Sequence, residues 1–141
     1  MKRHMDKGWW LLVALSVAAC RPAAAPGTPQ EAWRLFVTRL QRADVEGAWS
    51  MLSPKTRELV TLRSQAISAA SGGQVRDEPH ALLFAAGRPG AVGEVREVSK
   101  SDDAAVLQVK GADGERTVKL VKADGRWLVD LSEQLEPKTQ P

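Results

Sequence analysis

The spacing of apolar residues changes once along this chain, from a helical period to an alternating one. Between about residues 28 and 70, apolar side chains recur three and four positions apart, as on one face of an α-helix. From about residue 91 onward, apolar and polar residues alternate, as in half-buried β-strands. The order predicts an α+β domain, with N-terminal helices packed on one face of an antiparallel sheet.

The first two helices carry local start signals. Thr28 and Glu31 match a capping box with a proline between them, and Asp44 is a typical N-cap residue. Behind each cap, apolar residues follow at positions i, i+3, i+4 and i+7, which predicts one buried stripe per helix. The stripes are Trp33, Phe36, Val37 and Leu40 in the first helix, and Val45, Ala48, Trp49 and Leu52 in the second.

A third helix is predicted from Ser53-Pro54 to about Ala70, where Gly72-Gly73 ends it. The segment "PHALLFAAG" at residues 79–87 predicts one or two further helical turns. The residues expected on the inward side of the third helix are Leu59, Val60, Arg63 (by its stem), Ala66 and Ile67.

Three or four strands are predicted in the second half of the domain. The alternating segments are "VGEVREV" (92–98), "AAVLQVKG" (104–111), "RTVKLVK" (116–122) and "RWLVDLS" (126–132). Asp-Gly pairs at 113–114 and 124–125 favour the tight turns of β-hairpins, and Asp102-Asp103 lies in the first reversal. The strands should therefore form an antiparallel meander.

The N-terminus has the pattern of a secretory signal peptide. Three basic residues precede an apolar run from Trp9 to Ala19, and small residues follow. A helix that spans a bilayer needs about 20 apolar residues, so this run is too short to span. We expect residues 1–19 to be a cleaved leader.

The four residues Val17-Ala18-Ala19-Cys20 resemble the lipobox of bacterial lipoproteins. The resemblance implies lipid attachment to the Cys20 thiol, cleavage just before it, and a membrane anchor. Ordinary secretion and an uncleaved anchor are the alternatives. Residues 20–27 would be a flexible tether, residues 28–132 the domain and residues 133–141 a C-terminal tail. Because Arg21 rather than an aspartate follows the cysteine, the periplasmic leaflet of the outer membrane is the favoured location.

Removal of the leader changes the charge balance. The whole chain has 20 basic and 17 acidic residues and a net charge of +3. The leader holds three of the basic and one of the acidic residues, so the net charge of the mature chain is +1. This balance gives no electrostatic case for nucleic-acid binding. Cys20 is the only cysteine, so its acylation would leave no thiol for a disulfide.

Two motifs carry a resemblance to a known fold. The pattern from Ala43-Asp44 through Trp49 to Ser53, and the later Asp124-Gly125-Arg126-Trp127, are similar to the nuclear transport factor 2-like superfamily. Within it, they are similar to small bacterial lipoproteins of unknown function. The resemblance covers about residues 28–132 and implies a curved sheet wrapped around a long helix, which makes a cone with an open mouth.

The sequence offers little for catalysis. Enzymes of the resembled superfamily use a tyrosine or a histidine–aspartate pair inside the cone, and this chain has no tyrosine. His80 is the one histidine that remains once the leader is removed. A small enzyme would need His80 in the cavity beside Asp77, Glu78 or Asp130, whereas the alternative is a surface histidine. One histidine also cannot supply a metal site, so neither a metal nor a cofactor is expected.

The tryptophans leave two interpretations open. Trp33, Trp49 and Trp127 lie on predicted apolar faces, where they either fill the core or, with His80, line a pocket for a small apolar ligand. We therefore expect a lipid-anchored, non-catalytic module that binds a small ligand or a protein. The alternatives are a structural or assembly protein of the envelope, and a small enzyme that uses His80.

Overall fold

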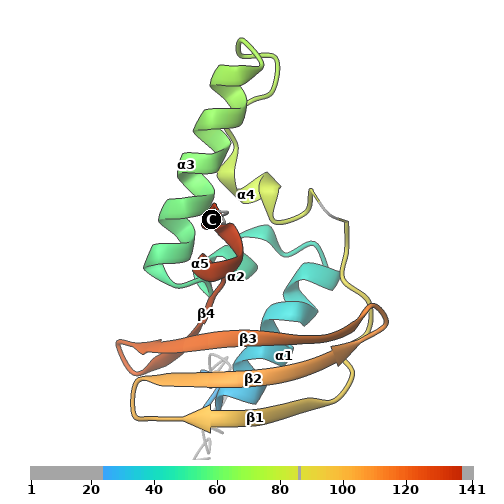
Figure 1. Ribbon diagram of the computed structural model, residues 1–141, viewed down its shortest axis with the longest axis vertical. Helices are drawn as coiled ribbons and strands as arrows, with labels where there is room; N and C mark the ends of the chain where they lie inside the picture. Colours follow the sequence, from blue (N-terminus) through green and yellow to red (C-terminus); the bar gives the residue numbers. More distant parts are fainter. Residues whose placement is uncertain (1–23, 86, 138–141) are drawn as a thin grey trace, which may run out of the picture.

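The protein is an α+β structure in which a four-stranded sheet carries one helix on its face and a second helix extends away from it (Figure 1). The computed structural model describes residues 24–85 and 87–137, so the leader and Cys20 lie outside the described residues. The helices are α1 (Pro29–Gln41), α2 (Val45–Ser50), α3 (Pro54–Ala70), α4 (Pro79–Leu82) and α5 (Ser132–Leu135). The strands are β1 (Val95–Lys100), β2 (Ala104–Gly111), β3 (Gly114–Ala123) and β4 (Arg126–Asp130).

The predicted helix starts are confirmed. The Glu31 N–H donates to Thr28 Oγ1 at 3.2 Å, and the Thr28 N–H donates back to the Glu31 carboxylate at 3.3 Å. Asp44 caps α2 by accepting the Gly47 N–H at 2.9 Å, and Ser53 caps α3. Side-chain acceptors at these positions satisfy N–H groups that have no partner inside the helix.

The strands form the predicted antiparallel meander in the order β1-β2-β3-β4. The β3–β4 turn consists of Asp124 and Gly125, whose φ angles are 50° and 72°. Two positive φ angles are typical of the type I′ turn that Asp-Gly pairs favour. The turn therefore sets the register in which Lys122 pairs with Trp127.

The core lies between α1 and one face of the sheet. Cross-strand pairing places alternate residues of β2, β3 and β4 on this covered face, where they pack against α1 and the end of α2. The buried cluster comprises Ala32, Trp33, Phe36, Val37, Ala48, Met51, Leu52, Ala105, Leu107, Val109, Val118, Leu120, Trp127 and Val129. Trp33, Phe36 and Val37 of the predicted α1 stripe are buried, as their spacing indicates.

The link between α2 and α3 continues the sheet beyond β4. The Val129 N–H donates to the Met51 carbonyl oxygen, and the Ser53 N–H donates to the Val129 carbonyl oxygen, both at 2.8 Å. Leu52 and Val129 form an isolated parallel bridge. This link covers part of the β4 edge and brings the start of α3 to the end of the last strand.

The packing of α3 differs from the prediction. The helix packs mainly against α4 and α5 rather than on the sheet, and its buried residues are Thr56, Val60 and Ser64. Arg63 and Ala66, expected to face inward, are exposed, and Leu59 and Ile67 are half-buried. The reason is that polar contacts orient this helix: Ser64 donates to Asp77 at 2.5 Å and Thr56 to Asp130 at 3.2 Å.

Candidate ligand-binding cavity

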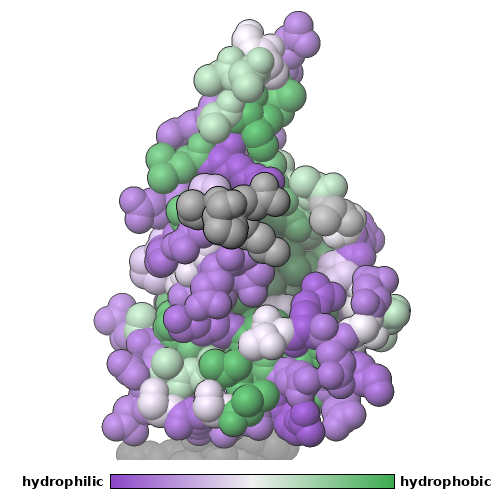
Figure 2. All heavy atoms as spheres, viewed as in Figure 1, coloured by the Kyte–Doolittle hydropathy of each residue, from purple (hydrophilic) through white to green (hydrophobic). Residues whose placement is uncertain are grey.

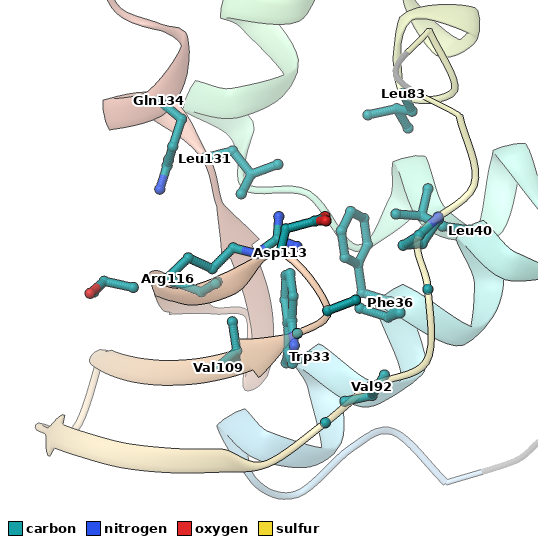
Figure 3. Close-up of a pocket in the computed structure, with 18 of the residues that line it drawn as sticks. Trp33, Phe36, Leu40, Leu83, Val92, Val109, Asp113, Arg116, Leu131 and Gln134 are labelled. Atoms are coloured by element: carbon teal, nitrogen blue, oxygen red, sulfur yellow. The ribbon is translucent and has the colours of Figure 1, made fainter.

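A cavity of about 610 Å³ lies between the sheet, α1 and the helices α3, α4 and α5, which we call the raised helices. Pockets that bind small molecules in proteins have volumes of about 300–1,000 Å³. Its lower wall is made by α1 and by the end of the sheet nearest the β2–β3 turn. Figure 3 shows Trp33 and Phe36 of this wall side by side, and their ring centroids are 5.8 Å apart. The apolar residues of the lower wall are Trp33, Phe36, Val37, Leu40, Val109 and Val118.

The upper wall comes from short elements and from one side of α3. In Figure 3, Leu83 points into the cavity from above and Leu131 from the start of α5. Hydrophobic surface is visible in the recess between α4 and the sheet (Figure 2). The apolar residues of this wall are Val60, Ile67, Leu82, Leu83, Leu131 and Leu135.

The segment from Pro89 to Gly93 forms the remaining wall. Gly93 lies directly against β2, because a Cβ at this position would lie 2.1 Å from the Lys110 carbonyl oxygen. Real Cβ atoms do not approach a backbone oxygen this closely, so only glycine fits here without a shift of the chain. The close approach brings Val92 into the cavity lining.

The cavity lining contains two arginines, and sequence reasoning did not select either as a site residue. Arg116 pairs with Val109 and is in phase with Val118 and Leu120, so it belongs to the row of β3 residues on the covered face. Its guanidinium lies over the end of β2, since a Cβ built on Gly111 would be 3.8 Å from Arg116 Nη2. The alternation in "RTVKLVK" already carries this signal, because a charge stands where the next apolar residue is expected.

Arg63 of α3 lines the opposite wall, and Asp113 of the β2–β3 turn is the acidic residue of the lining. Lys110 also borders the cavity, but it pairs with Glu115 in the row that faces away from α1. Among residues 24–85 and 87–137, no ion pair involves Arg63, Arg116 or Asp113. The lining therefore combines apolar walls with cations that no carboxylate of the described chain neutralises.

The four candidate pocket residues separate in the structure. Trp33 lines the cavity, whereas Trp49, Trp127 and His80 are not among its lining residues. Trp127 is buried in the core, with the ammonium groups of Lys122 and Lys100 at 5.6 and 6.0 Å from its ring centroid. At such distances a cation is attracted to the face of an aromatic ring.

Trp49 and His80 form a contact of their own. Their ring centroids are 4.2 Å apart, and His80 Nδ1 lies 2.7 Å from Glu46 Oε1. The contact joins α4 to α2. His80 therefore pairs with Glu46 and is not among the residues that line the cavity, whereas the enzyme hypothesis requires it in the cavity beside Asp77, Glu78 or Asp130.

A buried polar cluster joins the start of α3 to the end of β4. Asp130 accepts hydrogen bonds from the Thr56 hydroxyl at 3.2 Å and from the Ser132 N–H at 2.9 Å. Thr56 Oγ1 in turn accepts the Leu131 N–H at 2.8 Å. Burial raises the pKa of Asp130, but hydrogen bonds from Ser132 and Thr56 outweigh it, so the pKa of this carboxyl lies below its ordinary value. The cluster holds Leu131 where it lines the cavity.

Within the described part of the chain, no three histidine, cysteine or acidic residues come together as metal ligands would. No helix within residues 24–85 and 87–137 has the length and apolar character needed to cross a membrane.

Neither a protein-family model nor a curated protein matches this chain.

Proposed function

We propose that this protein is a lipid-anchored module of the bacterial cell envelope that faces the periplasm and binds a small apolar ligand without transforming it. The anchor is the proposed acyl group on Cys20, and the favoured location is the periplasmic leaflet of the outer membrane. A nuclear transport factor 2-like cone is the proposed fold within the α+β class, and its support is the arrangement of α1 along one face of a four-stranded sheet.

The observation that carries the binding function is the apolar cavity. Its volume of about 610 Å³ is suited to a small molecule, and its walls bring aromatic and aliphatic side chains from α1, the sheet and the raised helices to one space. Transfer of apolar ligand surface from water to such walls stabilises a complex by about 25 cal/mol per Å². A binding role needs no catalytic group in this space.

The envelope location has separate support in the sequence. A basic flank, a short apolar run and the residues Val17-Ala18-Ala19-Cys20 occur in the order typical of a lipoprotein leader. Two or more acyl chains hold a protein on a membrane durably, at about 0.8 kcal/mol per buried methylene. The proposed anchor would keep the cavity at the surface of the membrane.

A neutral apolar dye tests the binding function. The protein is produced as residues 21–141, without the leader and Cys20, so that it carries no anchor but keeps the whole described core. It is titrated with N-phenyl-1-naphthylamine, whose fluorescence emission rises in apolar surroundings. Saturable binding is expected. Leu83→Trp should weaken it at least about tenfold by filling the cavity, whereas Leu62→Trp, at a residue 53% exposed on α3, should not. Absence of saturable binding, or equal effects of both variants, would contradict the proposal.

The alternative of an envelope assembly protein makes a different prediction. A pull-down of the anchored protein from detergent-solubilised membranes should recover one partner protein in stoichiometric amount if assembly is its role. A ligand-binding module should recover none at that ratio.

A further inference from the structure

The cavity lining includes the positively charged side chain of Arg116, which the binding of a purely apolar ligand would not require. Arg116 occupies the covered face of β3, in the row that continues with Val118 and Leu120. Arg116 is exposed at the cavity, so its head group is in contact with water when no ligand is bound. A ligand that covered it without bringing an opposite charge would leave a desolvated, unpaired charge, which is costly. In Figure 3, Arg116 lies on the hairpin side of the cavity, across from Leu131 and Leu83.

Three of the described arginines, Arg39, Arg76 and Arg96, have side-chain partners, whereas Arg34, Arg42, Arg57, Arg88 and Arg126 have none among the described residues and do not line the cavity. Arg39 donates to the Gly47 carbonyl oxygen at 2.6 Å and pairs with Asp44, and Arg96 donates to Gln108. Arg116 and Arg63 make neither ion pairs nor side-chain hydrogen bonds to any residue between 24 and 137 that the structure describes. Both line the cavity, from opposite walls. Their donors are therefore available to a ligand.

We infer that the ligand is a single-chain amphiphile with an anionic head group, whose head binds Arg116 while its aliphatic chain lies against Trp33, Phe36 and Leu83. The inference rests on the proposed binding function and adds the chemical class of the ligand. The guanidinium group has a planar set of N–H donors that matches a carboxylate or a phosphate in two parallel hydrogen bonds. Arg63 contributes a second positive charge from α3.

The cavity combines a positively charged end with apolar walls, and this combination indicates the chemical class of the ligand. An inorganic anion would leave the aromatic and aliphatic walls in contact with water, and a neutral hydrocarbon would leave both arginines without a partner. A cationic amphiphile would place like charges together. An anionic head with one chain satisfies both parts of the cavity.

Displacement of the bound neutral dye measures the preference. Three ligands with the same twelve-carbon chain are compared on residues 21–141: dodecanoate, dodecanol and dodecyltrimethylammonium. We expect dodecanoate to bind about 10- to 100-fold more tightly than dodecanol, as one or two hydrogen bonds to a charged group would provide. The cationic ligand should bind least tightly. Dodecyl phosphate, as a further arm, distinguishes a phosphate head from a carboxylate head.

Two variants test whether Arg116 causes the preference for dodecanoate over dodecanol. Arg116→Gln should remove most of the advantage of dodecanoate and leave dodecanol binding unchanged, whereas Arg126→Gln, at the β3–β4 turn, should change neither. Chain length provides the second readout: from eight to twelve carbons, the affinity of the carboxylates should rise about fourfold per methylene.

The outcomes separate this inference from the proposed function. If the neutral dye binds saturably but dodecanoate and dodecanol bind equally, or if Arg116→Gln affects both alike, the ligand class is wrong and the binding function stands. If neither the dye nor any amphiphile binds, both are wrong.

Discussion

The hydroxyl group of Thr56 donates a hydrogen bond to Asp130 across 74 residues of chain, and the two residues are 0% and 7% exposed. The bond fastens the first turn of α3 to the end of β4. Because Leu131 follows directly and lines the cavity, the same bond positions part of the upper wall.

Asp130→Asn should lower the free energy of unfolding by about 1–3 kcal/mol at pH 7, since the ionised carboxylate accepts hydrogen bonds that a neutral amide accepts less well. The folded protein holds the pKa of Asp130 below its ordinary value of about 3.9. The stabilisation is therefore complete above about pH 5 and is lost as the pH falls through the folded-state pKa. Urea unfolding at pH 7 and at pH 3 measures it.

Asp102→Asn is the matched control for this experiment, because Asp102 is exposed in the first reversal of the sheet. Its stability should equal that of the parent protein at both pH values. If Asp130→Asn lowers the free energy of unfolding equally at pH 7 and pH 3, the charge of the carboxylate contributes nothing to stability. That result would contradict the role assigned to Asp130.

The elements of the fold were predictable because their signals are local. The caps at Thr28, Asp44 and Ser53 and the turn at Asp124-Gly125 each depend on residues within four positions of one another. The alternation of strand residues also predicts the meander and its covered face.

The face of α3 was not predictable in the same way. Its buried residues are oriented by Asp77 and Asp130, which are 13 and 74 residues from their partners. The contact of Trp49 with His80 likewise joins two helices that no sequence period relates. Of the candidate pocket residues, Trp33 alone lines the cavity. The position of Arg116 could have been read from strand alternation, but the cavity that it lines depends on tertiary packing.

The contact between His80 and α2 should support the upper wall of the cavity. His80→Ala removes both the bond to Glu46 and the stacking on Trp49, so α4 should exchange its amide hydrogens faster and the neutral dye should bind severalfold more weakly. His80→Phe keeps an aromatic ring over Trp49 and should have a smaller effect. Hydrogen exchange over residues 79–85 measures the change, and an unchanged exchange rate in His80→Ala would contradict it.

Asp113→Asn should increase the affinity for dodecanoate about threefold at low salt, because removal of the acidic residue from the lining reduces repulsion of the anionic head. Binding of dodecanol should not change. The increase should shrink at about 1 M salt, where charges are screened within about 3 Å. Asp102→Asn, at the opposite end of β2, is again the control. An equal increase in its affinity for dodecanoate would contradict the repulsion assigned to Asp113.

The proposed anchor predicts a specific failure of processing. Cys20 lies outside the described residues, so the expectation depends on its sequence context alone. Cys20→Ala should leave an uncleaved precursor, because the lipoprotein peptidase requires an acylated cysteine, and labelled palmitate should mark only the parent protein. Ala19→Gly keeps a small residue before the cysteine and should be processed and labelled normally.

The residue after the cysteine provides the test of location. The parent protein carries Arg21 there, and it should be recovered with the outer membrane on a density gradient. Arg21→Asp introduces the residue that resembles the retention signal of inner-membrane lipoproteins and should shift the protein to the inner membrane, with palmitate labelling unchanged. Release of Cys20→Ala as a cleaved, water-soluble product would show that the leader is an ordinary secretion signal, and the cavity would then act free in the periplasm.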